Sequence, residues 1–265
     1  MRPKKFAIAT LVYGPSIYRV MAKILFDTAR RHGFFAQAEP VLLTPEAIPE
    51  SEFSKWGVRV VEIPQRNYPF RPQGPCPGTY QKFETYRLTD YQKVLFSDAD
   101  AYVIDRDLFS FRLPAPVFLV EQHVPLATGN FLIEPNLAVY ERLVGAAMNS
   151  SFDVSQGWEN CGEAPPWPEW HRRKFHEQFV TTTHELIRNN SWNFVFAGAE
   201  QGLLYYYHSY CTSGYMSYHF PAFYHLSGVG RAARLLGNLR DPYWQAAEDA
   251  GVADELRQAC LDCLD

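Results

Sequence analysis

Short apolar runs alternate with stretches of helical spacing in the first quarter of the chain, and this alternation restricts it to few folds. Phe6–Val12 is nearly continuous in apolar residues, as strands buried on both faces are. Ile17–Arg31 comes next with apolar residues at helical spacing, and Gly33 stands where a helix can end in a left-handed conformation. Pro40–Leu43 and Val58–Ile63 predict two further strands. Because parallel strands need crossover connections, this order predicts a parallel sheet with right-handed crossovers.

The pattern resumes after an irregular loop. Arg66–Gly78 contains four prolines and two glycines, and it separates the first strands from the later elements. Residues 150 to about 195 lack hydrophobic periodicity, so we expect an inserted excursion there rather than an independent domain. The remaining predicted elements are a helix at Thr79–Thr89, strands at Val94–Phe96, Val117–Val120 and Asn130–Ile133, helices at Asn136–Met148 and Ala199–Tyr207, and a helical tail from about Arg231. We therefore expect residues 1–265 to form a single α/β domain.

Composition bounds the class of protein. The 265 residues are 47% hydrophobic, which is enough for a substantial core. A formal net charge of −4 shows no basic footprint and argues against a nucleic-acid partner. Aromatic residues reach 15%, which fits a core and also a concave surface that stacks rings or sugars. Nothing in the sequence predicts an oligomeric state.

The sequence also bears on location. The five cysteines are odd in number and scattered, which disfavours a secreted disulfide framework. No run of 18 apolar residues occurs, and the apolar start of the chain is too short for a signal peptide. We therefore expect no transmembrane segment and a cytoplasmic location. The sequence leaves open a targeting segment removed before residue 1.

Two aspartates, Asp98 and Asp100, interrupt the apolar segment Lys93–Ile104. Carboxylates in such a setting need a positive partner. If the strand persists, residues i and i+2 point to the same side and the two carboxylates converge at the sheet edge where α/β proteins bind ligands. Two hard oxygen ligands suit Mg²⁺ or Mn²⁺. The alternative is a turn whose aspartates cap backbone N–H groups, and the D-x-D pattern alone leaves both open.

The surrounding segments are more specific. Residues 79–109, TYQKFETYRLTDYQKVLFSDADAYVIDRDLF, place a helical lysine, a Leu-Thr-x-Tyr segment, an apolar strand ending in Asp-x-Asp and a closing Asp-Leu-Phe in order. This arrangement resembles the glycogenin-like retaining nucleotide-sugar glycosyltransferases of family 8. Three later segments agree: TGNFLIEPNLAVYERLV with Thr128-Gly129, AEQGLL with Glu200-Gln201, and FYHLSGVGR with His225, Gly228 and Arg231. The resemblance runs from Lys4 to about Arg231, apart from the excursion.

The resemblance implies a Rossmann-like, GT-A-type fold with a mixed, mostly parallel sheet. It implies transfer of a sugar from a UDP-sugar, with retention of configuration. The sequence leaves a glycan, a protein side chain and a polyol open as the acceptor, and we expect the 150–195 excursion to help choose it. Asp98, Asp100 and His225 would hold Mn²⁺, with Mg²⁺ as an alternative. The catalytic residues would be Glu200, Gln201 and Lys82. The donor would be contacted by Thr10, Tyr13, Lys82, Ser97, Asp98, Ala99, Thr128, Gly129, Gly228 and Arg231.

The chain departs from the family's pattern at three positions. Ala127 stands where an asparagine is usual, Glu200 replaces an aspartate, and Arg231 replaces a lysine. These changes leave the reaction class standing, but glucose, galactose, N-acetylglucosamine and glucuronic acid all remain open as the transferred sugar. Gln201 is a poor nucleophile. This favours a front-face route in which Glu200 or Gln201 steadies the oxocarbenium-like sugar.

Other interpretations compete with this one. A non-catalytic nucleotide-sugar or carbohydrate-binding protein would use the same fold. A glycoside hydrolase needs two carboxylates on opposite sides of the sugar, and an oxidoreductase would show G-x-G-x-x-G where residues 13–16 read YGPS. Single residues also have plainer roles: Lys82 as a solvated helix residue, Glu200 in a capping box, His225 in the core, and Tyr13 in turn packing.

Overall fold

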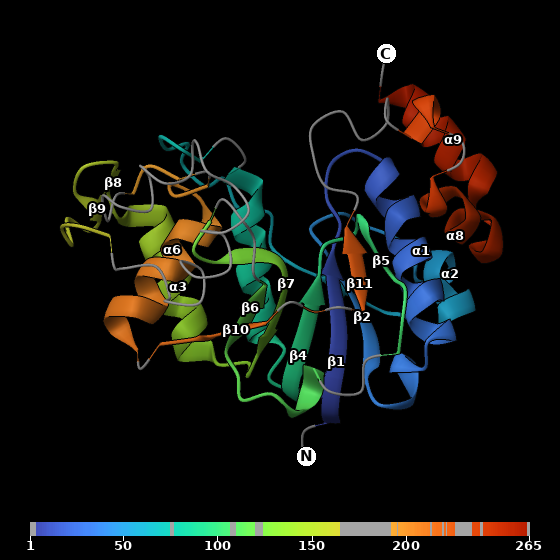
Figure 1. The fold of residues 1–265 in the computed structure, drawn as a ribbon, viewed down its shortest axis with the longest axis horizontal. Helices are drawn as coiled ribbons and strands as arrows, with labels where there is room; N and C mark the ends of the chain where they lie inside the picture. The colour runs from blue at the N-terminus through green and yellow to red at the C-terminus, as the bar shows by residue number, and fades with distance from the viewer. Residues whose placement is uncertain are drawn as a thin grey trace, which may run out of the picture. The chain divides into compact units, whose positions relative to one another are not determined.

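The structure is a computed structural model that describes residues 4–74, 77–106, 110–119, 124–164, 192–194, 196–212, 214–218, 220, 222–225, 235–238 and 241–263. The chain divides into two compact units (Figure 1). The first unit comprises residues 1–65, 90–113 and 220–265, and the second comprises residues 66–89 and 114–219. The single domain over residues 1–265 stays a prediction.

The first unit is built on four parallel strands. Their order is β4-β1-β2-β3, with bounds Tyr91–Ser97, Lys4–Leu11, Glu39–Thr44 and Arg59–Glu62. Helix α1 (Ile17–Arg31) connects β1 to β2, together with the short 3₁₀ helix η1 (Phe34–Ala36). Helix α2 (Glu50–Phe53) and the 3₁₀ helix η2 (Ser54–Trp56) connect β2 to β3. The predicted parallel strands and the helix at Ile17–Arg31 are therefore confirmed.

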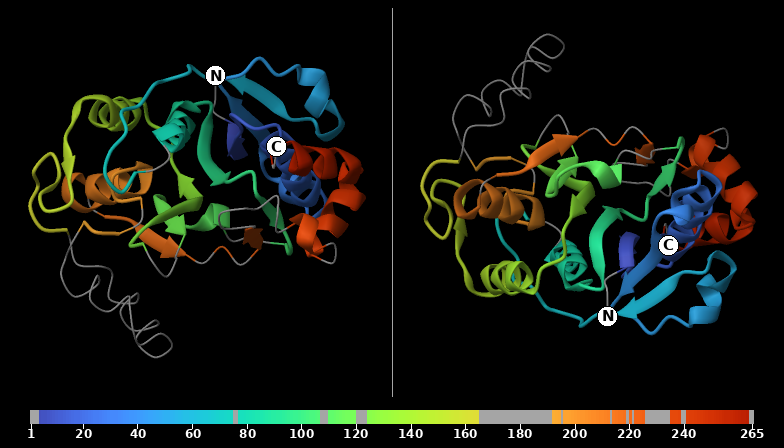
Figure 2. Two further views of the ribbon diagram at one scale, coloured as in Figure 1. Left: turned by 90° about the horizontal axis from the view of Figure 1, so that it is seen from above. Right: turned by 90° about the horizontal axis from the view of Figure 1, so that it is seen from below.

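The C-terminal tail covers α1. Helices α8 (Pro242–Ala250) and α9 (Ala253–Asp262) lie beside α1 in every view (Figures 1 and 2) and bury their apolar faces in the same core. Asp241 caps α8 by accepting a hydrogen bond from Tyr243 N. Within the described residues, the predicted helical tail is confirmed.

The second unit combines three neighbouring strands with packed helices. The sheet order is β10-β6-β7, in which β10 is parallel and β7 antiparallel to β6. The bounds of the strands are Met216–Tyr218 (β10), Val117–Leu119 (β6) and Ala127–Ile133 (β7). The other elements are the 3₁₀ helix η3 (Pro77–Arg87), α3 (Leu137–Asn149), the hairpin β8–β9 (Phe152–Asp153 and Gly157–Trp158), α6 (Glu200–Tyr206) and the π-helix η5 (Tyr207–Cys211).

Several sequence expectations need adjustment. The segment predicted as a helix at Thr79–Thr89 is a 3₁₀ helix, and the strand expected from Asn130 begins at Ala127. Asn136, expected as the first residue of a helix, is instead the N-cap of α3, because its side chain accepts hydrogen bonds from Ala138 N and Val139 N. In the part of the chain that is described, no helix is both long and apolar enough to cross a membrane.

Candidate functional site

A buried charged cluster in the second unit brings together residues from three separate segments, η3, β7 and α6. Lys82 Nζ lies 3.7 Å from Glu200 Oε1, and these side chains are 9% and 3% exposed. Thr128 Oγ1 donates a 2.7 Å hydrogen bond to Glu200 Oε1, and Lys82 Nζ lies 3.2 Å from Thr128 Oγ1. Thr79 Oγ1 donates a short hydrogen bond to the other carboxylate oxygen, Oε2. Lys82 is therefore a buried, paired residue rather than a solvated one.

The 3₁₀ geometry of η3 explains why Thr79 joins Lys82. Residues i and i+3 eclipse one another in a 3₁₀ helix, so Thr79 and Lys82 share one face. Thr85, three residues further on, donates a 2.6 Å hydrogen bond to the Lys82 carbonyl oxygen. The helix thus presents a hydroxyl and an ammonium to the same carboxylate.

Strand β7 contributes through an irregular pairing. Phe118 pairs with Phe131 and Leu119 with Ala127, so residues 128–130 fall between two successive pairings. This bulge turns the Thr128 N–H toward Gln201, whose Oε1 accepts it at 3.3 Å. Thr128 thereby contacts Glu200 with its hydroxyl and Gln201 with its backbone.

The turn that precedes Glu200 is tightly held. Phe196 has a left-handed φ of 63°, which is costly for a bulky residue. A Cβ at Gly202 would lie 1.8 Å from the Ala197 carbonyl oxygen, so the Glu-Gln-Gly sequence needs glycine there. Tyr80 OH donates to Gly198 O at 2.6 Å, and the buried Trp158 Nε1 donates to Ala197 O at 2.9 Å. These contacts fix where Glu200 and Gln201 begin α6.

The cluster is suited to holding a polar ligand, because it places one negative and one positive charge beside an amide side chain. Glu200 accepts hydrogen bonds from two threonines, and these contacts take the place of the capping-box role considered for it. The predicted residues Lys82, Thr128, Glu200 and Gln201 are thus neighbours. Gly129 lies in the bulge of β7 beside Thr128.

The first unit carries the two aspartates. Strand β4 ends at Ser97, and the next strand, β5, starts at Ala101 (Ala101–Val103). The sequence left a continuing strand and a turn both open here, and the structure shows a turn, with Ala101 N donating to Asp98 O at 3.1 Å. Asp100 is buried and Asp98 half-buried, while Ser97 and Ala99 pack into the interior.

A short ribbon brings a third predicted ligand to this turn. Strand β11 (Phe223–His225) pairs antiparallel with β5, and its register sets the His225 backbone opposite Ala101, the residue after Asp100. The His225 side chain, Gly228, Arg231 and Asp107–Phe109 lie outside what the structure describes. Among the described side chains, no three His, Cys, Asp or Glu residues form a metal-binding group.

The end of β1 holds the remaining predicted contacts. Thr10 is fully buried, and its hydroxyl has no hydrogen-bond partner among the described residues. Tyr13 is half-buried in the turn after the strand, where Gly14 has a φ of +78°. Gly14 N donates a 2.6 Å hydrogen bond to Glu46 Oε1, so the carboxylate of Glu46 holds this turn.

Sequence reasoning missed Thr79 and Glu46. Thr79 lies 121 residues before Glu200, and nothing in the sequence pairs the two. Glu46 lies 32 residues from Gly14, and nothing in the sequence pairs the two. Trp158 and Trp192 of the excursion are buried and both pack against the Phe152 ring, while residues 165–191 lie outside the described parts.

The chain shares sequence similarity with curated plant glucuronosyltransferases. It is 26% identical over 185 residues to UDP-glucuronate:xylan alpha-glucuronosyltransferase 1 of Arabidopsis thaliana, covering 67% of this chain and 27% of that protein. It is also 26% identical over 153 residues to inositol phosphorylceramide glucuronosyltransferase 1 of the same plant, covering 53% and 26%. The chain therefore spans about a quarter of the length of these curated relatives. No protein-family model matches the chain.

A solved structure supports the fold. The glycosyltransferase GlyE of Streptococcus pneumoniae TIGR4 matches 96% of this chain and 63% of its own, with a TM-score of 0.53 and 14% identity. At 14% identity, this similarity supports the fold and nothing about function. The resemblance to family 8 glycosyltransferases is confirmed, and so is a Rossmann-like, GT-A-type α/β fold whose described strand pairs are mixed and mostly parallel.

Proposed function

We propose that the chain is a metal-dependent retaining glycosyltransferase that takes its sugar from a UDP-sugar. The observation that carries the proposal is the buried cluster of Lys82, Thr128, Glu200 and Gln201, because distant segments of the chain converge on it. Two independent lines support it: the similarity to curated glucuronosyltransferases and a GT-A-type fold. As the relatives' names specify UDP-glucuronate or a glucuronosyl group, UDP-glucuronate is the donor we propose first.

The residues of the first unit fit a divalent ion. Asp98 and Asp100 offer hard oxygen ligands from one turn, and the β5–β11 register sets His225 next to them in the backbone. Two carboxylates and an imidazole suit Mn²⁺. These three residues would hold the ion, which supplies positive charge to the diphosphate leaving group when bound.

The other residues act by binding and orientation. The buried hydroxyl of Thr10 is available to the nucleotide at the carboxyl end of β1. In the second unit, Lys82 provides positive charge and Gln201 an amide that can orient sugar hydroxyls. Both carboxylate oxygens of Glu200 already accept threonine hydrogen bonds, which favours electrostatic steadying of the sugar over nucleophilic attack. A covalent glycosyl group trapped on Glu200 would contradict this front-face route.

A donor panel tests the proposal. UDP-glucuronate, UDP-glucose, UDP-galactose and UDP-N-acetylglucosamine are incubated with Mn²⁺ and with xylo-oligosaccharide or inositol phosphorylceramide, and UDP release is measured. We expect release from UDP-glucuronate that needs Mn²⁺, an α-linked product by NMR, and a loss of about 100-fold or more in Asp100→Asn. The control is Asp90→Asn, because Asp90 is exposed and lies just before β4, whereas Asp100 lies just after it. A chain that binds UDP-sugars but releases UDP from none would instead be a binding protein.

A further inference from the structure

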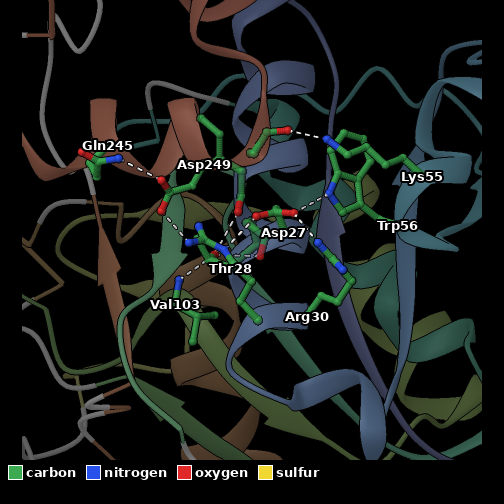
Figure 3. Close-up of polar contacts among 12 residues, drawn as sticks. Asp27, Thr28, Arg30, Lys55, Trp56, Val103, Gln245 and Asp249 are labelled. Carbon is green, nitrogen blue, oxygen red and sulfur yellow. Dashed lines mark hydrogen bonds and ion pairs between the residues drawn. The ribbon is translucent and has the colours of Figure 1, made fainter.

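Thr28 is a buried residue in the last turns of α1 whose hydroxyl links this helix to the β5–β11 ribbon. It is 2% exposed. Thr28 Oγ1 lies 2.9 Å from Ile24 O and 3.0 Å from Leu25 O, so its hydrogen is donated within the helix. The oxygen then accepts the Val103 N–H of β5 at 3.0 Å (Figure 3).

The ribbon geometry leaves Val103 dependent on this contact. Along an antiparallel strand, the backbone N–H groups of successive residues point alternately toward the partner strand and away from it. Because Ile104 N donates to Ala222 O at 2.8 Å, toward the β11 side, the Val103 N–H points away from β11 and toward α1. Without the Thr28 oxygen this N–H would be buried without a partner.

Ring contacts also hold this ribbon, which has three residues in each strand. The Tyr102 ring packs 5.3 Å from that of Tyr224 and 5.4 Å from that of Tyr243, and Phe223 packs 5.6 Å from Phe34. The hydrogen bond from Val103 N to Thr28 Oγ1 adds a directional contact that fixes the position of β5 along α1. By fixing β5, this hydrogen bond also fixes the Asp98–Asp100 turn that precedes β5 and the His225 backbone that pairs with Ala101.

We propose that Thr28 is a positioning residue for the metal site: its hydroxyl sets the position of β5 against α1, and through β5 that of the Asp98–Asp100 turn and of His225. This inference rests on the proposed function, because it assigns Thr28 to the ion that those three residues would hold. Thr28 lies on α1 and acts through Val103 rather than as a ligand.

Three variants separate positioning from stability. Thr28→Val removes the acceptor and keeps the side-chain shape, and Thr28→Ser restores the hydroxyl. Trp56→Phe removes the 3.1 Å hydrogen bond from Trp56 Nε1 to Asp27 Oδ1, one residue earlier on α1, and leaves β5 unchanged (Figure 3). Thr28→Ala replaces Thr28→Val if the valine variant does not fold.

The readouts are Mn²⁺ affinity, from the electron paramagnetic resonance of free Mn²⁺ without nucleotide, and the thermal unfolding midpoint. We expect Thr28→Val to weaken Mn²⁺ binding about tenfold, the effect of one buried hydrogen bond, with recovery to within about twofold in Thr28→Ser. Trp56→Phe should lower the unfolding midpoint and keep the wild-type Mn²⁺ affinity.

The outcomes distinguish the inference from the function on which it rests. If the wild type binds Mn²⁺ and Thr28→Val binds it equally well, the inference is wrong and the proposed function stands. If Trp56→Phe loses as much affinity as Thr28→Val, the effect is general destabilisation and the inference is again wrong. A wild type that binds no Mn²⁺ contradicts the metal-dependent function, and the positioning role fails with it.

Discussion

At the residue scale, the Lys82–Glu200 pair is a buried ion pair, so each charge affects stability more than a charge on the surface would. The sequence allows Lys82 to be a solvated lysine, but its side chain is 9% exposed and faces a carboxylate that is 3% exposed. Charges are costly to bury, so each depends on the other and on the hydroxyls of Thr79 and Thr128.

This dependence predicts strong coupling between Lys82 and Glu200. Glu200→Gln removes a negative charge 3.7 Å from a buried ammonium and should cost about 3 kcal/mol of unfolding free energy. Lys82→Met should cost a similar amount. The double variant should lose at least about 1 kcal/mol less than the sum of the two losses, measured by urea unfolding.

The exposed pair Arg59–Asp90 is the matched control. Its side chains are 40% and 69% exposed, with Arg59 NH1 3.3 Å from Asp90 Oδ2. Arg59→Met and Asp90→Asn should each change stability by less than about 1 kcal/mol. Additive losses at Lys82 and Glu200 would show that the two charges do not depend on one another.

At the element scale, helix and strand positions can be predicted from the sequence, whereas helix type and local pairing cannot. Apolar spacing predicts α1 to its ends, whereas it does not predict that residues 20–29 are all buried, which follows from the C-terminal helices that cover α1. The 3₁₀ form of η3, the bulge in β7 and the turn at Asp98–Asp100 depend on tertiary contacts that spacing does not encode. These three irregular elements carry the candidate residues Lys82, Thr128 and the Asp98–Asp100 pair, and local rules are expected to fail at functional positions.

The buried histidine of the π-helix η5, His208, predicts how the stability of the protein depends on pH. His208 Nε2 lies 3.5 Å from Tyr86 OH, and Nδ1 lies 3.4 Å from Thr212 Oγ1. Burial away from water lowers the pKa of His208 from its ordinary 6.5 to about 4. The unfolded chain therefore takes up this proton first as the pH falls below 6.5. The stability that His208 contributes is complete above about pH 6.5 and is lost as the pH falls toward 4.

We expect this loss to be on the order of 3 kcal/mol between pH 7 and pH 4. The measurement is urea unfolding of the wild type and of His208→Gln at pH 7, 5.5 and 4.5. The wild type should lose more stability than His208→Gln over this range, although the variant starts from a lower value. Parallel pH dependences would contradict a neutral, desolvated histidine.

At the scale of the whole molecule, the family resemblance predicted more of the site than periodicity could. It grouped Lys82, Thr128, Glu200 and Gln201, which are far apart in the sequence and contact one another in the second unit. It also paired Asp100 with His225, whose backbones the β5–β11 register brings together. Spacing could not show this, because long-range contacts leave no local signal.

What the resemblance could not supply is the choice of sugar. Ala127, Glu200 and Arg231 depart from the family's pattern at positions that would meet the donor. The curated relatives narrow this to a proposal of UDP-glucuronate, although the chain spans only about a quarter of their length.

The central claim, that the aspartates of the first unit hold a divalent ion that binds a uridine diphosphate, is tested most directly by calorimetric titration of UDP. The titration is done with Mn²⁺, with chelator, and with the variant Asp100→Ala in Mn²⁺. We predict UDP binding that requires Mn²⁺ and is lost in Asp100→Ala. UDP binding of equal affinity in chelator, or no binding in either condition, would contradict the claim.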